Sequence, residues 1–340
     1  MISIKDIAKR LNVTPSTVSR ALNGKKGVSK ELASEILKTC QAMGYRKNVI
    51  AQSLITKESK LIGMIIPDIT SRYYSFIVKG INTYLEEHGY SVILCNANRS
   101  EKNEKNYIDL LLSRRVDGII IISLTATEDT LLCIQKTGTP IVQIDNAITE
   151  KISSITNDNY RGAVILFEHM VALGCKRIGL MMGRAENTTT IERLRGFRDV
   201  MAKHNIEVDE NLITFIDSTD TQAYETTPKL LKHHPDSIFA INDNVALGVL
   251  RYCMDHNIKV PEQLRLAGYD DLDIARMVQV PLTTVHQLKT TLGHAAAKLM
   301  VQQIKHPNDP QQHITMIPHL VVRESLGEKL RSKPKPFNFN

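Results

Sequence analysis

The sequence predicts an α/β protein: an N-terminal three-helix headpiece of the helix-turn-helix type, followed by two lobes that are each built on a doubly wound parallel sheet. Three observations predict this architecture. Residues 1–46 hold three short amphipathic segments, each with a helix-start signal. From residue 61 onward, short apolar runs alternate with helix-length amphipathic stretches, as in parallel sheets covered by helices. Positive charge is concentrated at the start, because residues 1–60 carry a net +8 and the rest of the 340-residue chain carries −1.

Capping residues place the three headpiece helices. Ser3 can cap the first helix, and Thr14 can cap the second, which has Pro15 at its first position, where a missing N–H costs nothing. A third helix is expected to start at Ser29 and to stop at Gly44. The apolar side chains expected to face a shared core are Ile7, Ala8, Leu11, Val18, Leu22, Leu32, Ile36, Leu37 and Cys40.

The second of these helices is the candidate DNA-reading element. In a helix-turn-helix unit this helix lies in the major groove, with its N-terminal residues at the base edges. That end carries small hydroxyls, which suit either base type, and Arg20, which can bind a guanine edge in bidentate fashion. The alternative is an ordinary three-helix structural domain, but the local positive charge favours a polyanionic partner. The residues expected to contact DNA here are Thr14, Pro15, Ser16, Thr17, Ser19, Arg20 and Asn23.

Nine apolar runs are expected to form strands in the rest of the chain, and a break near residues 157–160 divides them between two lobes. The first series comprises Leu61–Ile66, Ser91–Cys95, Gly118–Ile122 and Pro140–Ile144. The second series comprises Arg177–Met182, Leu212–Ile216, Ser237–Ile241, Leu264–Tyr269 and Leu282–Val285. Amphipathic helices are expected between them, for example at Phe76–His88, Glu104–Arg115, Ala163–Leu173 and Ala246–His256. Residues 331–340, which lack any pattern, are expected to form a flexible tail.

The headpiece contains a long motif. It consists of Ile4-Lys5-Asp6-Ile7-Ala8 and, after a short break, Val13-Thr14-Pro15-Ser16-Thr17-Val18-Ser19-Arg20-Ala21-Leu22-Asn23. Gly44-Tyr45 and Ala51-x-x-Leu54 follow it. This pattern resembles the lactose-repressor family of bacterial transcription regulators, and the resemblance continues along almost the whole chain.

The resemblance implies that residues 47–60 are a hinge that folds into a short helix on operator DNA. Leu54 would then wedge into the minor groove, with Ala51 one turn earlier. The alternative is that Leu54 is a linker residue that packs on the sensor. Lys47 and Gln52 stand where the family often has a proline and an arginine. These two departures leave the start of the hinge helix open and remove one phosphate contact.

The resemblance also implies the architecture of residues 61–330. They would form an effector-binding and dimerisation domain of the periplasmic-binding-protein type, whose chain crosses between the lobes three times. The N-lobe would comprise about 61–158 and 290–318, and the C-lobe about 159–289 and 319–330. The protein is expected to be a homodimer or a tetramer that represses transcription from pseudo-palindromic operator DNA. It is also expected to be cytoplasmic and nucleoid-associated.

Residues that follow the predicted strands form a polar, carboxylate-rich set. Ligands of such sheets bind outside the carboxyl ends of the strands. Arg193 and Asp270 also resemble the family's effector-binding arginine and aspartate. The alternative is that loop Asp and Asn residues are turn formers and caps, which we prefer for Asn146, Asn244 and Asp271. The residues expected to contact an effector are Tyr73, Tyr74, Asp145, Asn187, Arg193, Asn242 and Asp270.

This set of side chains suits a sugar or a sugar derivative, because carboxylates, amides and an arginine bind hydroxyls and an aromatic face covers the ring. Arg72 together with Arg193 would suit an anionic derivative, although a solvated Arg72 is the simpler interpretation. Purine-binding members of the family have an aromatic residue where this chain has Ser218 and an arginine where it has Asn187. Members that bind a phosphoprotein have a basic residue where it has Val280. These differences argue against both partners.

No enzyme, cofactor or metal site is expected, because GxxxxGK[ST], GxGxxG, GxSxG and HExxH motifs are absent and His233-His234 is typical of a turn. The five cysteines are scattered, which favours reduced thiols. We expect no signal peptide and no membrane span. The runner-up interpretation is a cytosolic sugar-binding or sugar-processing protein with a basic appendage. Such a protein would not need the helix at residues 14–23 or the hinge.

Overall fold

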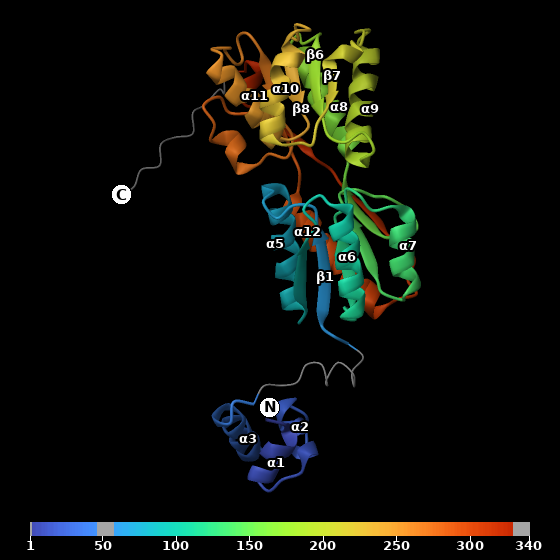
Figure 1. The fold of residues 1–340 in the computed structure, drawn as a ribbon, viewed down its shortest axis with the longest axis vertical. Helices are drawn as coiled ribbons and strands as arrows, with labels where there is room; N and C mark the ends of the chain where they lie inside the picture. Colours follow the sequence, from blue (N-terminus) through green and yellow to red (C-terminus); the bar gives the residue numbers. More distant parts are fainter. Residues whose placement is uncertain (1, 46–57, 329–340) are drawn as a thin grey trace, which may run out of the picture. The chain divides into compact units, whose positions relative to one another are not determined.

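The computed structural model describes residues 2–45 and 58–328 (Figure 1). The chain forms two compact units, Met1–Ser59 and Lys60–Asn340. The expected hinge residues Ala51 and Leu54, and the expected tail, lie outside the described residues. Within the described part, no helix has the length and apolar character needed to cross a membrane.

Three helices form the first unit: α1 (Ile4–Arg10), α2 (Pro15–Leu22) and α3 (Lys30–Ala42). Their N-termini are capped as the sequence predicts. The Asp6 carboxylate accepts the Ser3 backbone N–H at 2.8 Å. The Thr14 hydroxyl accepts the Thr17 N–H and the Ser29 hydroxyl accepts the Leu32 N–H, each at 3.2 Å. Asn12 makes the break between α1 and α2 with a φ of 53°, a conformation that asparagine tolerates better than most residues.

The core of the headpiece is formed by one residue stripe from each helix. Ile7, Val18 and Ile36 are fully buried. The expectation that Leu37 faces this core is wrong, because its side chain is 53% exposed. Leu37 follows Ile36 by one residue, so it is rotated by about 100° around the helix axis and leaves the i, i+4 stripe that the core uses.

The N-lobe of the second unit contains a six-stranded parallel sheet with the order β11-β5-β4-β3-β1-β2. Its strands are β1 (Leu61–Ile66), β2 (Ser91–Asn96), β3 (Gly118–Ile121), β4 (Ile141–Ile144), β5 (Ser154–Asn157) and β11 (His313–Met316). Two helices pack on each face. Helices α5 (Arg72–Glu87) and α12 (Lys289–Lys305) share one apolar cluster with the sheet, and α6 (Glu101–Ser113) and α7 (Glu128–Lys136) share the other.

The C-lobe contains a four-stranded parallel sheet with the order β7-β6-β8-β9. Its strands are β6 (Ile178–Met182), β7 (Ile213–Phe215), β8 (Ser237–Ala240) and β9 (Arg265–Ala267). The helices of this lobe are α8 (Asn159–Ala172), α9 (Thr188–Lys203), α10 (Asp220–Leu231) and α11 (Asp243–Asp255). Short 3-10 helices occur at Glu210–Leu212, Asp273–Arg276 and Glu324–Leu326. These parallel sheets covered by helices confirm the predicted fold class.

An antiparallel pair, β10 (Thr284–His286) and β12 (His319–Val321), joins the lobes. After β10 the chain returns to the N-lobe through α12 and β11, and β12 then leads it back to the C-lobe (Figure 1). The sequence did not predict β5, β11 and β12. Each has three or four residues, and their polar side chains interrupt the apolar runs by which the other strands were found.

Candidate functional site

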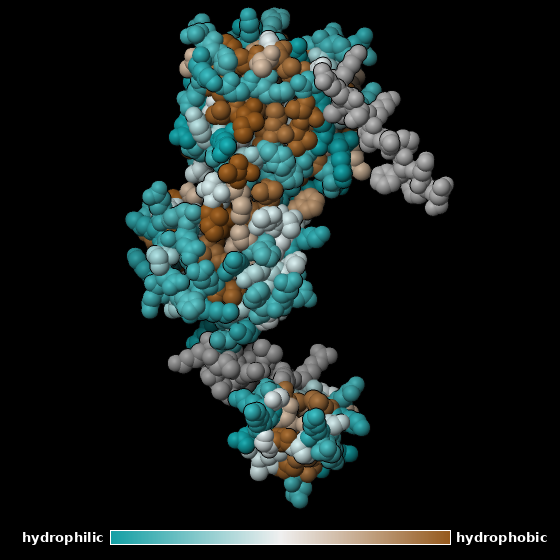
Figure 2. Space-filling view, turned by 180° about the vertical axis from the view of Figure 1, so that it is seen from behind, coloured by the Kyte–Doolittle hydropathy of each residue, from teal (hydrophilic) through white to brown (hydrophobic). Residues whose placement is uncertain are grey.

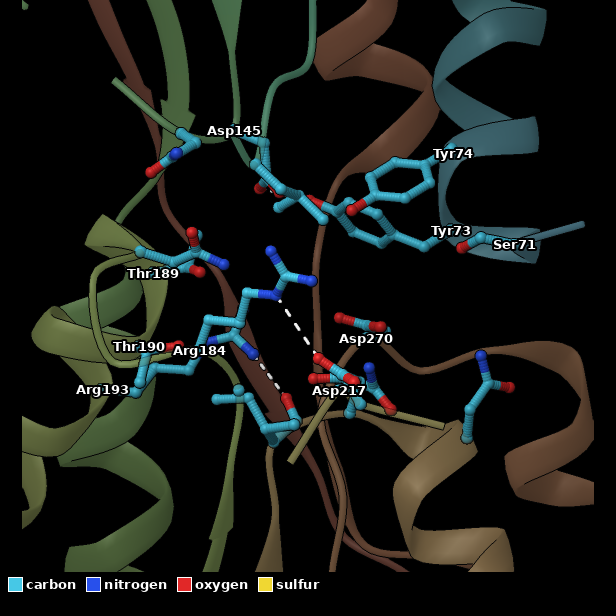
Figure 3. A pocket seen from close by; sticks show the side chains of 18 of the residues that line it. Ser71, Tyr73, Tyr74, Asp145, Arg184, Thr189, Thr190, Arg193, Asp217 and Asp270 are labelled. Carbon is cyan, nitrogen blue, oxygen red and sulfur yellow. Dashed lines mark hydrogen bonds and ion pairs between the residues drawn. The ribbon is translucent and has the colours of Figure 1, made fainter. Parts of the chain in front are cut away.

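A polar cavity lies at the carboxyl ends of the strands of both lobes (Figure 3). The lining residues follow β1, β2, β3, β4 and β10 on one side and β6, β7, β8 and β9 on the other. Parallel strands bring their carboxyl ends to one edge of each sheet, so short loops from distant parts of the sequence meet there. All seven residues expected from the sequence line this cavity: Tyr73, Tyr74, Asp145, Asn187, Arg193, Asn242 and Asp270.

On the N-lobe side, Asp145 is held by a tyrosine. The Tyr73 hydroxyl, from the first turn of α5, donates to Asp145 Oδ1 at 2.7 Å. Burial raises the pKa of Tyr73, so this hydroxyl remains a donor at neutral pH. Burial also raises the pKa of Asp145, and the Tyr73 hydrogen bond opposes that rise. Asn157 donates to the Tyr73 oxygen at 3.2 Å and fixes the ring.

On the C-lobe side, Asp270 lies just beyond β9 and is 6% exposed. The Gln287 side chain donates to Asp270 Oδ1 at 2.5 Å, and the Lys289 ammonium donates to the Asp270 carbonyl oxygen. Burial raises the pKa of Asp270 to about 8, although the nearby charge of Arg193 opposes this. A buried carboxyl group with a raised pKa gains strongly from hydrogen-bond donors brought by a ligand.

Arg193, on α9, is fixed by contacts on three sides. Its Nε and Nη2 both donate to Asn159 Oδ1, at 2.9 and 2.8 Å, and its Nη1 donates to the Ile241 carbonyl oxygen. The guanidinium also stacks on Tyr269, 3.5 Å from the ring centroid. Only 5% of Arg193 is exposed. Its remaining N–H groups are therefore held in one orientation at the cavity, which is the arrangement expected of a ligand-binding arginine.

The amides and the second tyrosine complete the lining. Asn242 caps α11, because its Oδ1 accepts the Val245 N–H at 2.9 Å, and its amide nitrogen remains for a ligand. Asn187 precedes α9 without a side-chain cap bond and is 8% exposed. Tyr74 packs edge-on against Tyr73, with the ring centroids 5.4 Å apart. Together these side chains offer donors, acceptors and an aromatic surface.

Four lining residues have a left-handed backbone, and one of them is Arg99, with a φ of 56°. The φ angles of the other three, Asp145, Ser218 and Asp270, are 68°, 58° and 106°. Such conformations are uncommon outside glycine and cluster at binding sites, where the surrounding structure holds them in place. The backbone therefore fixes the direction of the carboxyl groups of Asp145 and Asp270.

Sequence reasoning missed four charged or amide residues of the cavity: Arg99, Arg184, Asp217 and Gln287. The first three directly follow β2, β6 and β7, so the rule that selected the other residues would have found them. Arg72, by contrast, is exposed and does not line the cavity. Asn146 and Asn244 also line it, whereas Asp271 does not and instead pairs with Arg323 at 2.6 Å.

Two hydrogen-bond contacts join the lobes beside the cavity. The Asn146 side-chain oxygen accepts the Thr188 backbone N–H at 3.0 Å and the Thr188 hydroxyl at 2.5 Å. Arg99 Nη1 donates to the Asp217 carbonyl oxygen at 3.0 Å. Asn146 and Arg99 belong to the N-lobe, and their partners belong to the C-lobe. The lobes are therefore in contact at the cavity, and a ligand that binds both can stabilise this arrangement.

Helix α2 presents most of the expected DNA-contact residues at the surface. Pro15, Ser16, Arg20 and Asn23 are exposed, and Thr17 and Ser19 are half-buried. The exposed Thr14 hydroxyl lies 2.8 Å from Ser16 Oγ and 2.9 Å from Thr17 Oγ1. Val18 faces the core, so it fixes which side of the helix is available to a partner.

Comparisons with known proteins agree with this architecture. Residues 3–48 match the family described as bacterial regulatory proteins, lacI family. Residues 59–324 match the family described as periplasmic binding proteins and sugar binding domain of LacI family.

The relatives match along almost their whole length. The HTH-type transcriptional repressor PurR of Pasteurella multocida (strain Pm70) is 31% identical over 336 residues, which are 97% of this chain and 100% of the relative. The lac repressor dimer bound to operator and the anti-inducer ONPF is 25% identical, with a TM-score of 0.86 over 96% of this chain and 99% of the other. A complex of the transcriptional regulator CelR with cellobiose is 25% identical, with a TM-score of 0.74 over 96% and 100%.

The headpiece, the two-lobed unit and the relatives lead to one assignment. The chain belongs to the LacI family of bacterial regulatory proteins and is a helix-turn-helix transcriptional repressor whose DNA binding is controlled by a small-molecule effector.

Proposed function

We propose that the effector is a sugar or a sugar derivative, held between the lobes by Arg193 and Asp270. The observation that carries this proposal is the cavity itself, where the buried Asp270, the half-buried Asp145 and an oriented arginine meet an aromatic pair. Sugar hydroxyls donate to carboxylates and accept from guanidinium, and the apolar face of a sugar ring packs on an aromatic ring. Tyr73 or Tyr74 would provide that ring, and Asp145, Asn187 and Asn242 would bind further hydroxyls.

A purine effector is less well supported, although PurR is the name of several relatives. A purine is planar and is bound by stacking on an aromatic side chain. Ser218, at the position that carries the aromatic residue in purine-binding members, lines the cavity with a small hydroxyl instead. Asn187 replaces the arginine.

We propose that residues 1–46 bind DNA through α2 and that residues 47–60 are the hinge. Thr14, Pro15, Ser16, Thr17, Ser19, Arg20 and Asn23 would contact the major groove, and Ala51 and Leu54 the minor groove. The operator would be pseudo-palindromic, because a single short helix reads few base pairs and two headpieces double the readout. The strong positive charge of residues 1–60 supports contact with the phosphate backbone.

The DNA-binding form would be a homodimer made through residues 61–330. Figure 2 shows apolar side chains gathered on the face of the C-lobe that is turned away in Figure 1. Two exposed apolar side chains of this lobe are Met254 and Met277, which are 61% and 71% exposed. Large exposed apolar patches mark protein interfaces. We place the protein at the nucleoid in the cytoplasm, where operator DNA is, and assign it no catalytic reaction.

Control of DNA binding would follow from lobe closure. A ligand that contacts Arg193 in one lobe and Asp145 in the other favours the closed form, by no more than its difference in affinity for the two forms. Closure would reorient the N-lobes of the dimer and alter the spacing of the two hinges. Operator DNA must then change effector affinity by the same factor as the effector changes operator affinity.

The test combines a thermal-shift panel and an operator titration, both with the full-length chain. A thermal-shift panel of sugars, sugar phosphates and sugar acids identifies ligands, because a specific ligand stabilises the folded state by mass action. Fluorescence anisotropy then measures operator affinity with and without each hit. We expect affinity to fall steeply with salt and to change with the hit. Equal affinity for scrambled DNA at moderate salt would refute specific recognition, and a panel without any hit that changes operator affinity would refute a sugar effector.

A further inference from the structure

Two arginines from opposite lobes line the effector cavity beside the residues discussed above. Arg99 follows β2 in the N-lobe and Arg184 follows β6 in the C-lobe. Arg99 is placed by a left-handed backbone with a φ of 56° and by a hydrogen bond from its N–H to the Pro67 carbonyl oxygen at 2.9 Å. In Figure 3 the Arg184 side chain extends into the cavity, and a contact joins it to Asp217.

Each of these arginines has a carboxylate beside its Nε atom. Arg184 Nε lies 3.4 Å from Asp217 Oδ1, and Arg99 Nε lies 3.5 Å from Asp68 Oδ2. Arg99 Nη1 donates to the Asp217 carbonyl oxygen. Among the described residues, both terminal nitrogens of Arg184 and Nη2 of Arg99 have no hydrogen-bond partner. The two guanidinium groups therefore both contact Asp217, and each keeps N–H groups that can bind a ligand.

The charge of the cavity favours an anion. Three arginines line it, together with the carboxyl groups of Asp145, Asp217 and Asp270. Burial raises the pKa of Asp270 to about 8, so this group is mostly protonated at pH 7. Among the lining residues, the three arginines then outnumber the carboxyl groups that can be ionised, and Asp68, outside the lining, offsets part of the charge of Arg99. The two terminal N–H groups of a guanidinium match two oxygens of a phosphate or a carboxylate in bidentate geometry.

We propose that Arg184 and Arg99 form an oxyanion subsite, so that the effector is a polyhydroxylated molecule with a phosphate or a carboxylate group. This inference rests on the proposed function and narrows its ligand class. The polyol part would bind the side chains around Asp145 and Asp270. The oxyanion would join Arg99 of the N-lobe to Arg184 of the C-lobe, beside the existing Arg99–Asp217 contact, and would strengthen closure of the two lobes.

The subsite can be tested without knowing the polyol part. The melting temperature of the full-length wild-type chain is measured in phosphate, in acetate and in chloride at equal ionic strength. A specific anion at about ten times its dissociation constant should raise the melting temperature by roughly 3–6 °C over chloride. Phosphate also stabilises folded proteins without a specific site, so only the part of a shift that is lost in Arg184→Gln is assigned to the subsite. A larger part with phosphate indicates a sugar phosphate, and a larger part with acetate indicates a sugar acid. Equal melting temperatures in all three salts would overturn the proposal.

Two variants of the subsite and one control variant show whether the shift in melting temperature arises at this subsite. Arg184→Gln should weaken the anion's apparent affinity at least tenfold, and Arg99→Gln should weaken it as well. Arg198→Gln is the control, because Arg198 lies on α9 in the same lobe, is paired with Glu210 at 2.7 Å and does not line the cavity. An equal anion effect in Arg184→Gln and in Arg198→Gln would overturn the assignment.

The same variants separate this inference from the proposed function. If a neutral sugar changes operator affinity while phosphate and acetate have no effect on stability, the sugar effector stands and the oxyanion subsite is wrong. If the anions bind through Arg184 but no sugar, sugar phosphate or sugar acid changes operator affinity, the subsite stands and the proposed effector class is wrong.

Discussion

Replacing Asp270 by asparagine should stabilise the empty protein and weaken effector binding. Asparagine has nearly the same shape, tolerates the φ of 106° better than most residues, and can still accept the Gln287 hydrogen bond. The substitution therefore removes a titratable group from the cavity without removing its contacts. Loss of the hydrogen bonds that the carboxyl group makes to the ligand should lower effector affinity by about 0.5–1.5 kcal/mol.

The gain in stability follows from the raised pKa. The pKa of Asp270 is about 8 in the folded protein, against 3.8 for the unperturbed group. Because the folded protein binds the proton more strongly than the unfolded chain, wild-type stability falls as the pH rises between these two values. Each pH unit in this window costs about 1.4 kcal/mol, so wild type should have lost about 4 kcal/mol at pH 7. The Asp270→Asn variant has no such group and avoids this loss.

Scanning calorimetry between pH 5 and 9, without added sugar, measures this difference. The melting temperature of Asp270→Asn should exceed that of wild type by a margin that grows by on the order of 10 °C between pH 5 and 8. Asp271→Asn is the matched control. Although burial opposes it, hydrogen bonds from Arg323 and His286 lower the pKa of Asp271, so this variant should melt below wild type. If the melting temperatures of wild type and Asp270→Asn changed equally with pH, the raised pKa of Asp270 would be refuted.

Three further predictions concern DNA binding and the arginine that binds the effector. Arg20→Ala should lower operator affinity by about 1–3 kcal/mol and reduce discrimination against scrambled DNA in anisotropy titrations. An equal loss of affinity for all DNA sequences would instead make Arg20 a phosphate contact. Leu54→Ala should weaken operator binding and reduce operator bending in gel-mobility assays, while effector affinity stays unchanged. Gly162→Ala should weaken effector binding in calorimetric titrations. A Cβ at this position would lie 2.1 Å from the Tyr269 hydroxyl and would displace the ring on which Arg193 stacks. Unchanged effector affinity would show that Arg193 does not need this ring.

Local signals predicted the headpiece and most strands well. Helix caps depend on residues within one turn, and Thr14 and Ser29 therefore marked helix starts that the structure confirms. The run Leu61–Ile66 is buried on both faces of the sheet and coincides with β1. Strand β5 was missed because Ser154–Asn157 has three polar residues among four. Such a strand is stabilised by its neighbours in the sheet, which a local pattern does not reveal.

The cavity was predictable to the extent that it follows from strand order. Asp145 and Asp270 were found because each directly follows a strand, and the carboxyl ends of parallel strands meet. Arg184 follows β6 in the same way, but the sequence analysis selected Asn187 and Arg193, which lie farther along the chain. Gln287 follows β10, whose partner β12 was not predicted. The hydrogen bond of Gln287 to Asp270 depends on the crossing of the chain between lobes, and no sequence signal marks it.

We propose above that an effector bound by Arg193 between the lobes controls operator affinity. The most direct test is an operator titration by fluorescence anisotropy, with and without the effector, on wild type and on Arg193→Gln. A saturating effector should change the wild-type operator affinity about 5- to 150-fold, the usual range of allosteric coupling, and should leave the operator affinity of the variant unchanged at the same concentration. An effector response of equal size at equal concentration in the variant would contradict this proposal.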